Sequence, residues 1–329
     1  MHNGDHSIDE IDRMISKRLA NVDRIIEKKL GSEGLHDKQS GSRIIPRDAK
    51  RSFLSALPPP ELCSVDRLVG DLTMTDETLR QTAAFVFYSP HVQTNALYKS
   101  MASATVFSPD LERPEVNAFA SNGDREGMQS SPLIVVLGGA ATLVHVAALA
   151  IAVDGVNGKG SHVLRDFVKS MGRRLCVGRG EFSPAMAAET VHEIGLDRYR
   201  GDLSIARKAQ SYAVGMMAQV IGHELGHIAL AHTLGASANL EVSRNQEREA
   251  DLFASSVIST SPFGEYLIAG PVVWELIWVW CEHAGNQRIS TTHPLSRERL
   301  LDFIRSNKEQ AAAIGISEST LRDFLPPGK

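Results

Sequence analysis

A long apolar segment, residues 211–234 (SYAVGMMAQVIGHELGHIALAHTL), contains three polar side chains in the pattern His-Glu-x-x-His. It has no proline and precedes Gly235, so we expect a buried central helix closed by a glycine cap. Residues four positions apart share one face of a helix, so His223 and His227 can bind one tetrahedral ion. Glu224 lies about 100 degrees around the axis, within reach of a water on that ion, where a carboxylate acts as a general base.

A second helix supplies the candidate third ligand. Residues 243–246 (SRNQ) fit a capping box that opens the helix EREADLFASSVI, with Glu247 in its first turn and Asp251 one turn later. We expect Glu247 to complete a zinc site that leaves the fourth position to water, and Asp251 to accept a hydrogen bond from a ligand imidazole. Alternatively, Glu247 and Glu249 are ordinary solvated carboxylates at a helix start, which leaves the buried histidines unexplained.

Residues beside the motif give two further expectations. In a helix interior, Gly222 and Gly226 each cost about 1 kcal/mol relative to alanine, which indicates that another backbone packs closely there. His232 follows His227 by five residues, and a continuing helix would turn it away from the metal-facing side. We therefore expect a structural role for His232 rather than a place among the ligands.

Other parts of the chain share a pattern with this motif: Glu-x-x-Ala-Asp at 247–251, EVNAFA at 115–120, Thr292-His293-Pro294, and Arg299-Leu300. Together they resemble the HtpX-type zinc endopeptidases, whose relatives include the CAAX prenyl protease. The resemblance covers about residues 110–155 and 211–302. It implies a mostly helical α+β fold of the gluzincin type, with a small sheet and a central HExxH helix, and a peptidase activity on polypeptides.

The resemblance also implies roles for residues outside the metal motif. Asn117 and Ala118 would lie on an edge strand that lines the cleft, where a substrate adds as a further strand. His293 would donate to the tetrahedral oxyanion, and Arg299 would lie near the active site. The alternative interpretation of His293 is a turn residue before Pro294.

The domain organisation departs from that family. We interpret residues 51–329 as one metallopeptidase domain with a helical insertion at about 156–210, where the sequence is unfamiliar, and we expect helices from 55 to 108. For residues 1–50 we expect an amphipathic helix, within 8–30, and a polar linker. This helix either packs on the body of the protein or mediates self-association.

Residues 132–153 carry no formal charge and are long enough to span a bilayer. Their β-branched start, the break at Gly138-Gly139 and the alanine-rich remainder favour a buried strand followed by a buried helix. A single membrane span or peripheral attachment is the minor alternative. The polar, acidic N-terminus lacks the features of a signal peptide, so we expect a cytoplasmic protein.

Composition bears on partners and compartment. Lys and Arg total 35 against 39 Asp and Glu, a net charge of -4 that gives no polybasic signal, so nucleic acid is not expected as a partner. Cys63, Cys176 and Cys281 are odd in number and far apart, so neither a disulfide framework nor a thiolate zinc site is expected. A reducing compartment fits this pattern.

The sequence therefore predicts a zinc-dependent endopeptidase with one Zn²⁺ per chain and a polypeptide substrate. The alternative is a non-catalytic, chaperone-like protein that uses the same cleft to hold polypeptide. The presence of Glu224 favours the enzyme.

Overall fold

The computed structural model describes residues 74–121, 131–158, 162–177, 180–199, 201–232, 240–259, 269–283 and 296–325. The chain divides into two compact units, Met1–Arg47 and Asp48–Lys329, and every described residue lies in the second. The expected amphipathic helix and linker at 1–50 lie outside the described residues, as do residues 51–73. Self-association through that helix therefore stays a prediction.

Three helices open the described part: α4 (Asp76–Phe87), α5 (Pro90–Thr94) and α6 (Ala96–Ala104). Each follows a residue whose side chain accepts a backbone N–H of the first turn, namely Thr75, Ser89 and Asn95. The expected helices are present here, but the helical prediction is wrong for residues 106–108. Those residues belong to a strand, because the buried side chain of Phe107 packs into the core from one face of a sheet.

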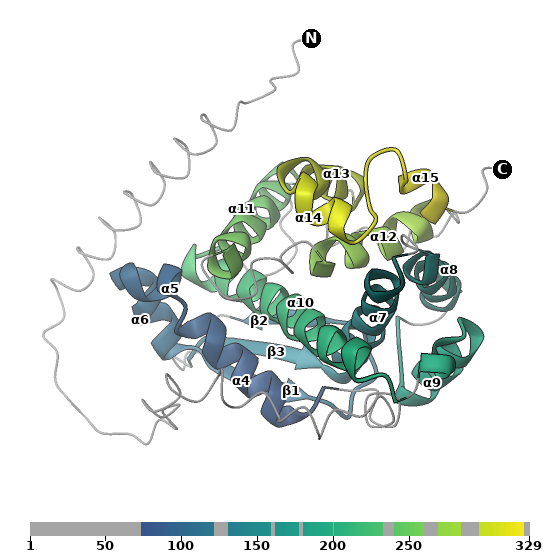
Figure 1. Cartoon of the computed structure of the whole chain (residues 1–329). Helices are drawn as coiled ribbons and strands as arrows, with labels where there is room; N and C mark the ends of the chain where they lie inside the picture. The colour runs from purple at the N-terminus through teal and green to yellow at the C-terminus, as the bar shows by residue number, and fades with distance from the viewer. Residues whose placement is uncertain are drawn as a thin grey trace, which may run out of the picture. The chain divides into compact units, whose positions relative to one another are not determined.

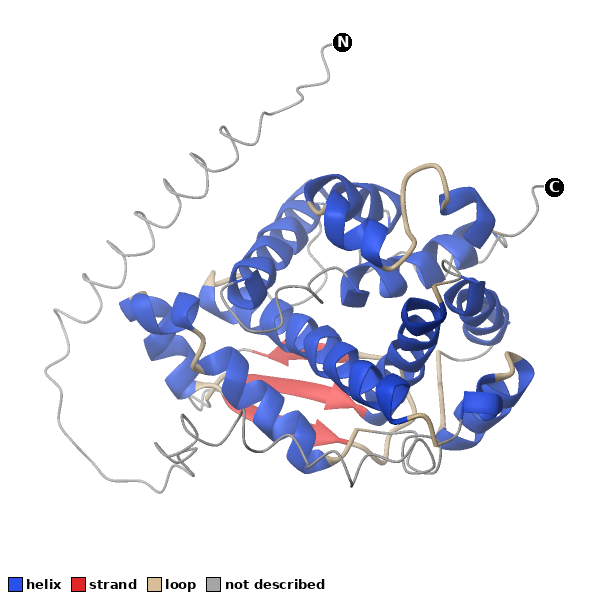
Figure 2. Ribbon diagram, viewed as in Figure 1, coloured by secondary structure: helices blue, strands red, loops and turns tan. Residues whose placement is uncertain are grey.

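The described sheet has three strands, β1 (Val106–Asp110), β2 (Ala118–Ser121) and β3 (Leu133–Leu137), in the order β1-β3-β2. β1 runs parallel to β3, and β2 runs antiparallel to it. Figure 2 shows this small sheet among helices, an α+β arrangement that is mostly helical. The strand expected at 115–120 is regular only from Ala118, while Glu115 forms an isolated bridge with Glu181.

Helix α7 (Gly138–Asn157) follows β3 directly, as the strand-then-helix interpretation of residues 132–153 predicts. A Cβ atom on Gly138 or Gly139 would collide with the backbone oxygen of Leu111 or Pro114, so this helix start requires glycine. Among the described helices, α7 is the one long and apolar enough to cross a membrane, and 89% of its most apolar window is buried in the protein. That burial is typical of a core helix.

The region expected as a helical insertion is helical. It contains α8 (His162–Val177), α9 (Pro184–Glu193) and the short 3-10 helix η2 (Leu196–Tyr199). The buried carboxylate of Asp154 accepts the backbone N–H groups of Val163 and Leu164 at 3.1 and 2.9 Å, which satisfies the first turn of α8. Whether this region is an insertion relative to a family stays a prediction.

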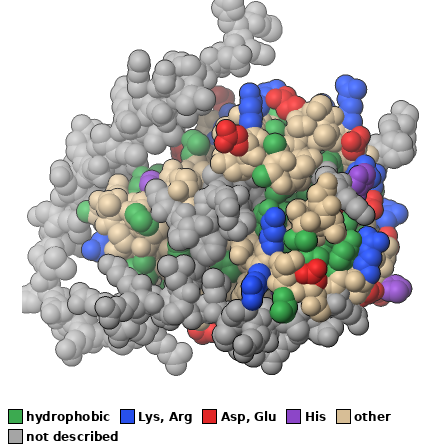
Figure 3. All heavy atoms as spheres, in the orientation of Figure 1, with side chains coloured by type: hydrophobic (Ala, Val, Ile, Leu, Met, Phe, Trp, Pro, Cys, Tyr) green, Lys and Arg blue, Asp and Glu red, His purple; other side chains and the backbone are tan. Residues whose placement is uncertain are grey.

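The remaining helices are α10 (Leu203–Ala229), α11 (Leu240–Ser259), α12 (Ala269–His283), α13 (Ser296–Ser306), α14 (Lys308–Ala313) and α15 (Leu321–Phe324). Figure 1 shows α10 crossing the centre of the described unit, where it packs against α7, α11, α12, α4 and β2. On the face drawn in Figure 3, basic and acidic side chains are interspersed over the described part.

Two predicted helix boundaries are wrong. α10 begins at Leu203 and ends at Ala229, where Ala231 adopts a left-handed φ of 53°, so the helix does not continue to Gly235. α11 begins at Leu240, so the Ser243–Gln246 segment lies inside the helix and does not cap it. Glu247 therefore lies more than one turn beyond the helix start, which removes the explanation of it as a first-turn carboxylate.

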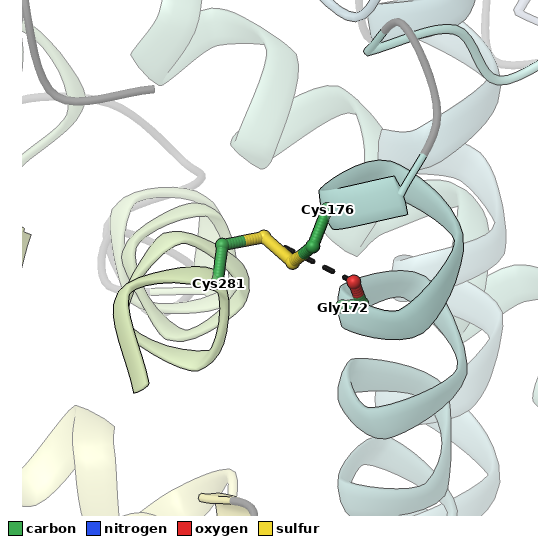
Figure 4. The surroundings of a disulfide bond; sticks show 3 residues. All are labelled: Gly172, Cys176 and Cys281. Carbon is green, nitrogen blue, oxygen red and sulfur yellow. Dashed lines mark hydrogen bonds between the residues drawn. A yellow bond between two sulfur atoms is a disulfide. The ribbon is translucent and has the colours of Figure 1, made fainter. Parts of the chain in front are cut away.

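The expectation of unpaired cysteines is also wrong. Cys176 of α8 and Cys281 of α12 form a disulfide across 105 residues of sequence, with their Cα atoms 5.3 Å apart (Figure 4). A side chain at Gly172 would overlap the indole of Trp280, so a glycine on α8 allows α12 to approach. Helix packing thus brings together two cysteines whose sequence spacing gives no sign of pairing.

Candidate metal centre

His223 and His227 lie one turn apart on α10, and their Nε2 atoms are 3.1 Å apart. Glu247 reaches them from α11: its carboxylate oxygens lie 3.3 Å from Nε2 of His223 and 3.6 Å from Nε2 of His227. The structure thus brings together the three residues that the sequence singles out as ligands. Within the described residues, this is the one group of His, Cys, Asp or Glu side chains with converging ligand atoms.

The distances suit a tetrahedral ion. Two ligand atoms that each lie about 2.0–2.1 Å from a tetrahedral zinc are about 3.3 Å apart. The three observed separations of 3.1, 3.3 and 3.6 Å bracket that value. Two imidazoles and one carboxylate leave the fourth position of such an ion open, as in catalytic zinc sites.

The close approach expected at the two glycines is present. A Cβ atom on Gly222 would lie 3.3 Å from Cα of Ala254, and one on Gly226 would lie 3.1 Å from Cα of Ala250. Both contacts are tighter than ordinary van der Waals distance. The two glycines thus allow α11 to pack directly on the backbone of α10, which brings Glu247 within reach of the histidines.

Asp251 contacts His223 as the sequence predicts: its Oδ1 lies 2.8 Å from Nδ1 of that ring. A carboxylate only accepts, so Nδ1 of His223 carries the proton of this hydrogen bond. Burial opposes a charge on His223, but the hydrogen bonds and negative charges of Asp251 and Glu247 raise its pKa to about 10. In the metal-free protein, His223 therefore holds a second proton, on the Nε2 that faces the cluster.

Arg299, which only the family resemblance suggested, lies at the centre of the surrounding charges. Its guanidinium donates to Asp251 at 2.8 and 3.0 Å and lies 3.4 Å from Glu247 and 3.0 Å from Glu275. Burial would raise the pKa of Asp251, but the charge of Arg299 and the hydrogen bond from His223 lower it. Asp251 therefore stays ionised between the two cations.

Glu275 was not identified from the sequence. It lies on α12 with 2% of its surface exposed, and Arg299 is its ion-pair partner. The available signal was a single acidic residue in the apolar run PVVWELIWVW. Buried carboxylates require a partner, so this signal indicated a buried cation without revealing which one.

His227 is held differently from His223. Burial, together with the charge of His223, lowers the pKa of His227 to about 3, so this ring is neutral. Its Nδ1 lies 3.0 Å from Nδ1 of His232, whose Nε2 lies 2.9 Å from Glu249. His232 is not among the three converging ligands, but the expectation that it turns away is wrong, because α10 ends before it and the chain bends back toward His227.

Of the other candidate residues, the structure describes Glu224, Asn117 and Ala118. Glu224 is partly buried on α10, directly after His223. Asn117 is exposed and immediately precedes β2, of which Ala118 is the first residue, and β2 is an edge strand of the described sheet that packs against α10. His293 lies outside the described residues, so its role stays a prediction.

Comparison with known proteins gives one family match, which covers the helices that carry this cluster. A family model described as Peptidase U49 matches residues 191–315, a range that contains His223, His227, Glu247 and Arg299 but not the sheet. No curated protein and no solved structure gives a match. The family match suggests a peptidase that acts on polypeptides. It does not support the HtpX-type family specifically.

Proposed function

We propose that this protein is a zinc-dependent endopeptidase in which His223, His227 and Glu247 hold one Zn²⁺ per chain. The observation that carries the proposal is the convergence of the two Nε2 atoms and the Glu247 carboxylate at 3.1–3.6 Å from one another, from two helices packed backbone to backbone. The peptidase family match over the same helices supports the reaction class.

The charges around the cluster support a divalent cation. Glu247, Asp251 and Glu275 are all at least 90% buried, and Arg299 contacts all three. Among the described residues, one guanidinium faces three carboxylates, and a proton on His223 supplies a second positive charge in the metal-free protein. Zinc would replace that proton and bring one more positive charge to these carboxylates.

When bound, zinc supplies Lewis-acid chemistry: it makes a water acidic and polarises the scissile carbonyl. Glu224, next to His223 and partly open to solvent, would take the proton of the attacking water and pass it to the leaving amine. Asp251 would hold His223 with its Nε2 lone pair toward the ion, and Arg299 would keep Asp251 and Glu247 ionised.

Finer assignments belong to the same proposal. Asn117 and Ala118 would present an edge strand to an extended substrate, and His293 would donate to the oxyanion. The gluzincin fold, membership of the HtpX-type family and a cytoplasmic location are further proposals. A non-catalytic polypeptide-binding protein would keep the cluster without turnover.

The test is zinc content by metal analysis, together with cleavage of casein, for the wild type, Glu224→Gln and Glu247→Ala. We expect one zinc and cleavage for the wild type, zinc without cleavage for Glu224→Gln, and loss of zinc for Glu247→Ala. A wild-type protein without zinc would contradict the proposal. Zinc binding without cleavage of any unfolded protein would favour the binding protein.

A further inference from the structure

Two residues that the proposed reaction does not use form a hydrogen-bonded chain behind one ligand. Nδ1 of His227 lies 3.0 Å from Nδ1 of His232, and Nε2 of His232 lies 2.9 Å from a carboxylate oxygen of Glu249. The side chains of His232 and Glu249 are 4% and 18% exposed, so this chain of contacts is largely shielded from water.

The carboxylate determines where the protons lie along this chain. Because Glu249 can only accept, Nε2 of His232 carries a proton and donates it. Nδ1 of His232 then accepts from the Nδ1–H of His227. A neutral His227 with its proton on Nδ1 has a bare Nε2, the atom that faces His223 and Glu247.

The end of α10 places His232 in this position at a conformational cost. The N–H of Ala231 donates to the carbonyl of Ile228 at 3.1 Å, and the N–H of His232 donates to the carbonyl of His227 at 2.9 Å, the two bonds of a Schellman turn. This turn requires a left-handed residue, usually glycine, and here Ala231 adopts it with φ 53°. The turn brings the His232 ring onto the face of α10 that carries His227.

We infer that His232 and Glu249 are positioning residues that fix the Nδ1–H tautomer of His227 and so aim its bare Nε2 at the metal site. The inference rests on the proposed zinc site. The Nδ1–H of His223 donates directly to Asp251, so the two ligand histidines are oriented by different means. For His227, the imidazole of His232 lies between the carboxylate of Glu249 and the ligand ring.

The experiment measures zinc affinity by chelator competition on the full-length protein, for the wild type, His232→Leu, His232→Gln and Glu249→Gln. The matched control is Glu241→Gln, which changes an exposed carboxylate on the same helix as Glu249. We expect His232→Leu to weaken zinc binding about 10–100-fold, because it leaves the Nδ1–H of His227 without an acceptor. His232→Gln can both accept and donate and should retain more affinity than His232→Leu.

Visible absorption of the Co²⁺-substituted proteins separates positioning from a merely structural role. A changed ligand orientation alters the Co²⁺ spectrum of His232→Leu and Glu249→Gln relative to the wild type and Glu241→Gln. A structural role would lower the free energy of unfolding of the metal-free protein while leaving the Co²⁺ spectrum and zinc affinity of the folded protein unchanged.

The outcomes distinguish this inference from the proposed function. Weakened zinc binding with an altered Co²⁺ spectrum in the His232 and Glu249 variants, and not in Glu241→Gln, supports it. Wild-type affinity and spectrum in Glu249→Gln and both His232 variants overturn it and leave the zinc site standing. A wild-type protein that binds no zinc removes the proposed function, and this inference with it.

Discussion

Gly226 of α10 faces Ala250 of α11 so closely that a Cβ atom at position 226 would lie 3.1 Å from Cα of Ala250 and 3.2 Å from Cβ of Phe253. Neither neighbour is the end of a flexible side chain, so the contact cannot be relieved by a rotamer change. Three residues before Ala250, Glu247 projects toward the histidines. The separation of α10 and α11 at this glycine therefore sets the geometry of the three candidate ligands.

Gly226→Ala should move α11 away from α10. Overpacking against backbone costs up to about 3 kcal/mol, and alanine gains only about 1 kcal/mol in helix propensity, so we expect a net loss of stability together with weaker zinc binding. Denaturant unfolding and chelator competition measure the two effects. Gly155→Ala is the control, because a Cβ there meets only the flexible end of Lys208, and it should not weaken zinc binding. Equal effects of the two substitutions would contradict the packing argument.

Arg299→Met should destabilise the metal-free protein strongly. It leaves Glu247, Asp251 and Glu275 buried without their shared cation, and breaking a buried ion pair costs about 3–5 kcal/mol. Chemical denaturation checks the value. Arg305→Met on the same helix is the control, because its partner Glu318 is exposed and the pair should contribute little. A small effect of Arg299→Met would show that the carboxylates are neutralised by other means.

Zinc binding should release one proton at about pH 6, from His223, whose pKa is raised to about 10 in the metal-free protein, because water on a catalytic zinc ionises only near pH 7. Below about pH 7, affinity should fall about tenfold for each unit of lowered pH, while His227, with a pKa of about 3, releases no proton. Titration calorimetry in buffers of different ionisation enthalpy counts the protons. Asp251→Asn removes one charge that holds the proton and should reduce the release. A binding enthalpy independent of the buffer would refute this prediction.

The same pKa shifts fix how the stability of the metal-free protein depends on pH. Between about pH 6.5 and pH 10, His223 binds a proton in the folded state that it does not bind in the unfolded state. Its contribution to the free energy of unfolding is therefore full below about pH 6.5 and is lost as pH rises through 10. His227 acts in the opposite direction: its stabilising effect is full above about pH 6.5 and is lost as pH falls toward 3. Chemical denaturation at several pH values, with a chelator present, should therefore show that His223 and His227 together contribute most to the free energy of unfolding near pH 6.5. A contribution from these two residues that still increases at pH 9 would contradict the prediction.

The sequence was informative where one helix sets the geometry. The four-residue spacing of His223 and His227 places both rings on one face, and the cost of Gly222 and Gly226 indicated a close backbone, which α11 provides. Contacts between distant elements were not predictable in this way. Glu275 and Arg299 meet only because α12 packs on α13, and the partner of a buried charge is set by that packing.

The capping residues expected from the sequence gave wrong ends for α10 and α11. Ser243 resembles an N-cap, yet residues 240–242 are compatible with helix, and α11 extends through them. At the end of α10, the expected glycine cap was Gly235, whereas the left-handed position is Ala231. Because an alanine gives no sign of a left-handed turn, the approach of His232 to His227 could not be predicted from the sequence.

Cys281→Ser should lower stability by about 2–4 kcal/mol under non-reducing conditions, because the disulfide with Cys176 constrains the unfolded chain across 105 residues. Denaturant unfolding with and without reductant measures the change, and peptide mapping should recover a linked Cys176–Cys281 peptide from the wild type. With reductant present, the wild type and the variant should differ much less. Equal stability of the two proteins without reductant would indicate that the pair is not oxidised.

Ala231→Gly should stabilise the protein without weakening the metal site. The left-handed conformation costs an alanine about 1–2 kcal/mol and costs glycine little, so we expect a gain of about 1 kcal/mol after allowing for the greater freedom of glycine in the unfolded chain. The backbone hydrogen bonds from residues 231 and 232 to the carbonyls of Ile228 and His227 need no side chain at 231, so His232 should stay in contact with His227.

Thermal denaturation and zinc affinity, measured on the same preparation, test both the expected gain in stability and the unchanged metal site of Ala231→Gly. Ala229→Gly, two residues earlier and still within regular helix, is the matched control and should destabilise the protein, since glycine there gains no relief of strain. A loss of stability in Ala231→Gly similar to that of the control would mean that the turn is not strained, and a loss of zinc affinity alone would mean that the alanine side chain itself holds His232 in place.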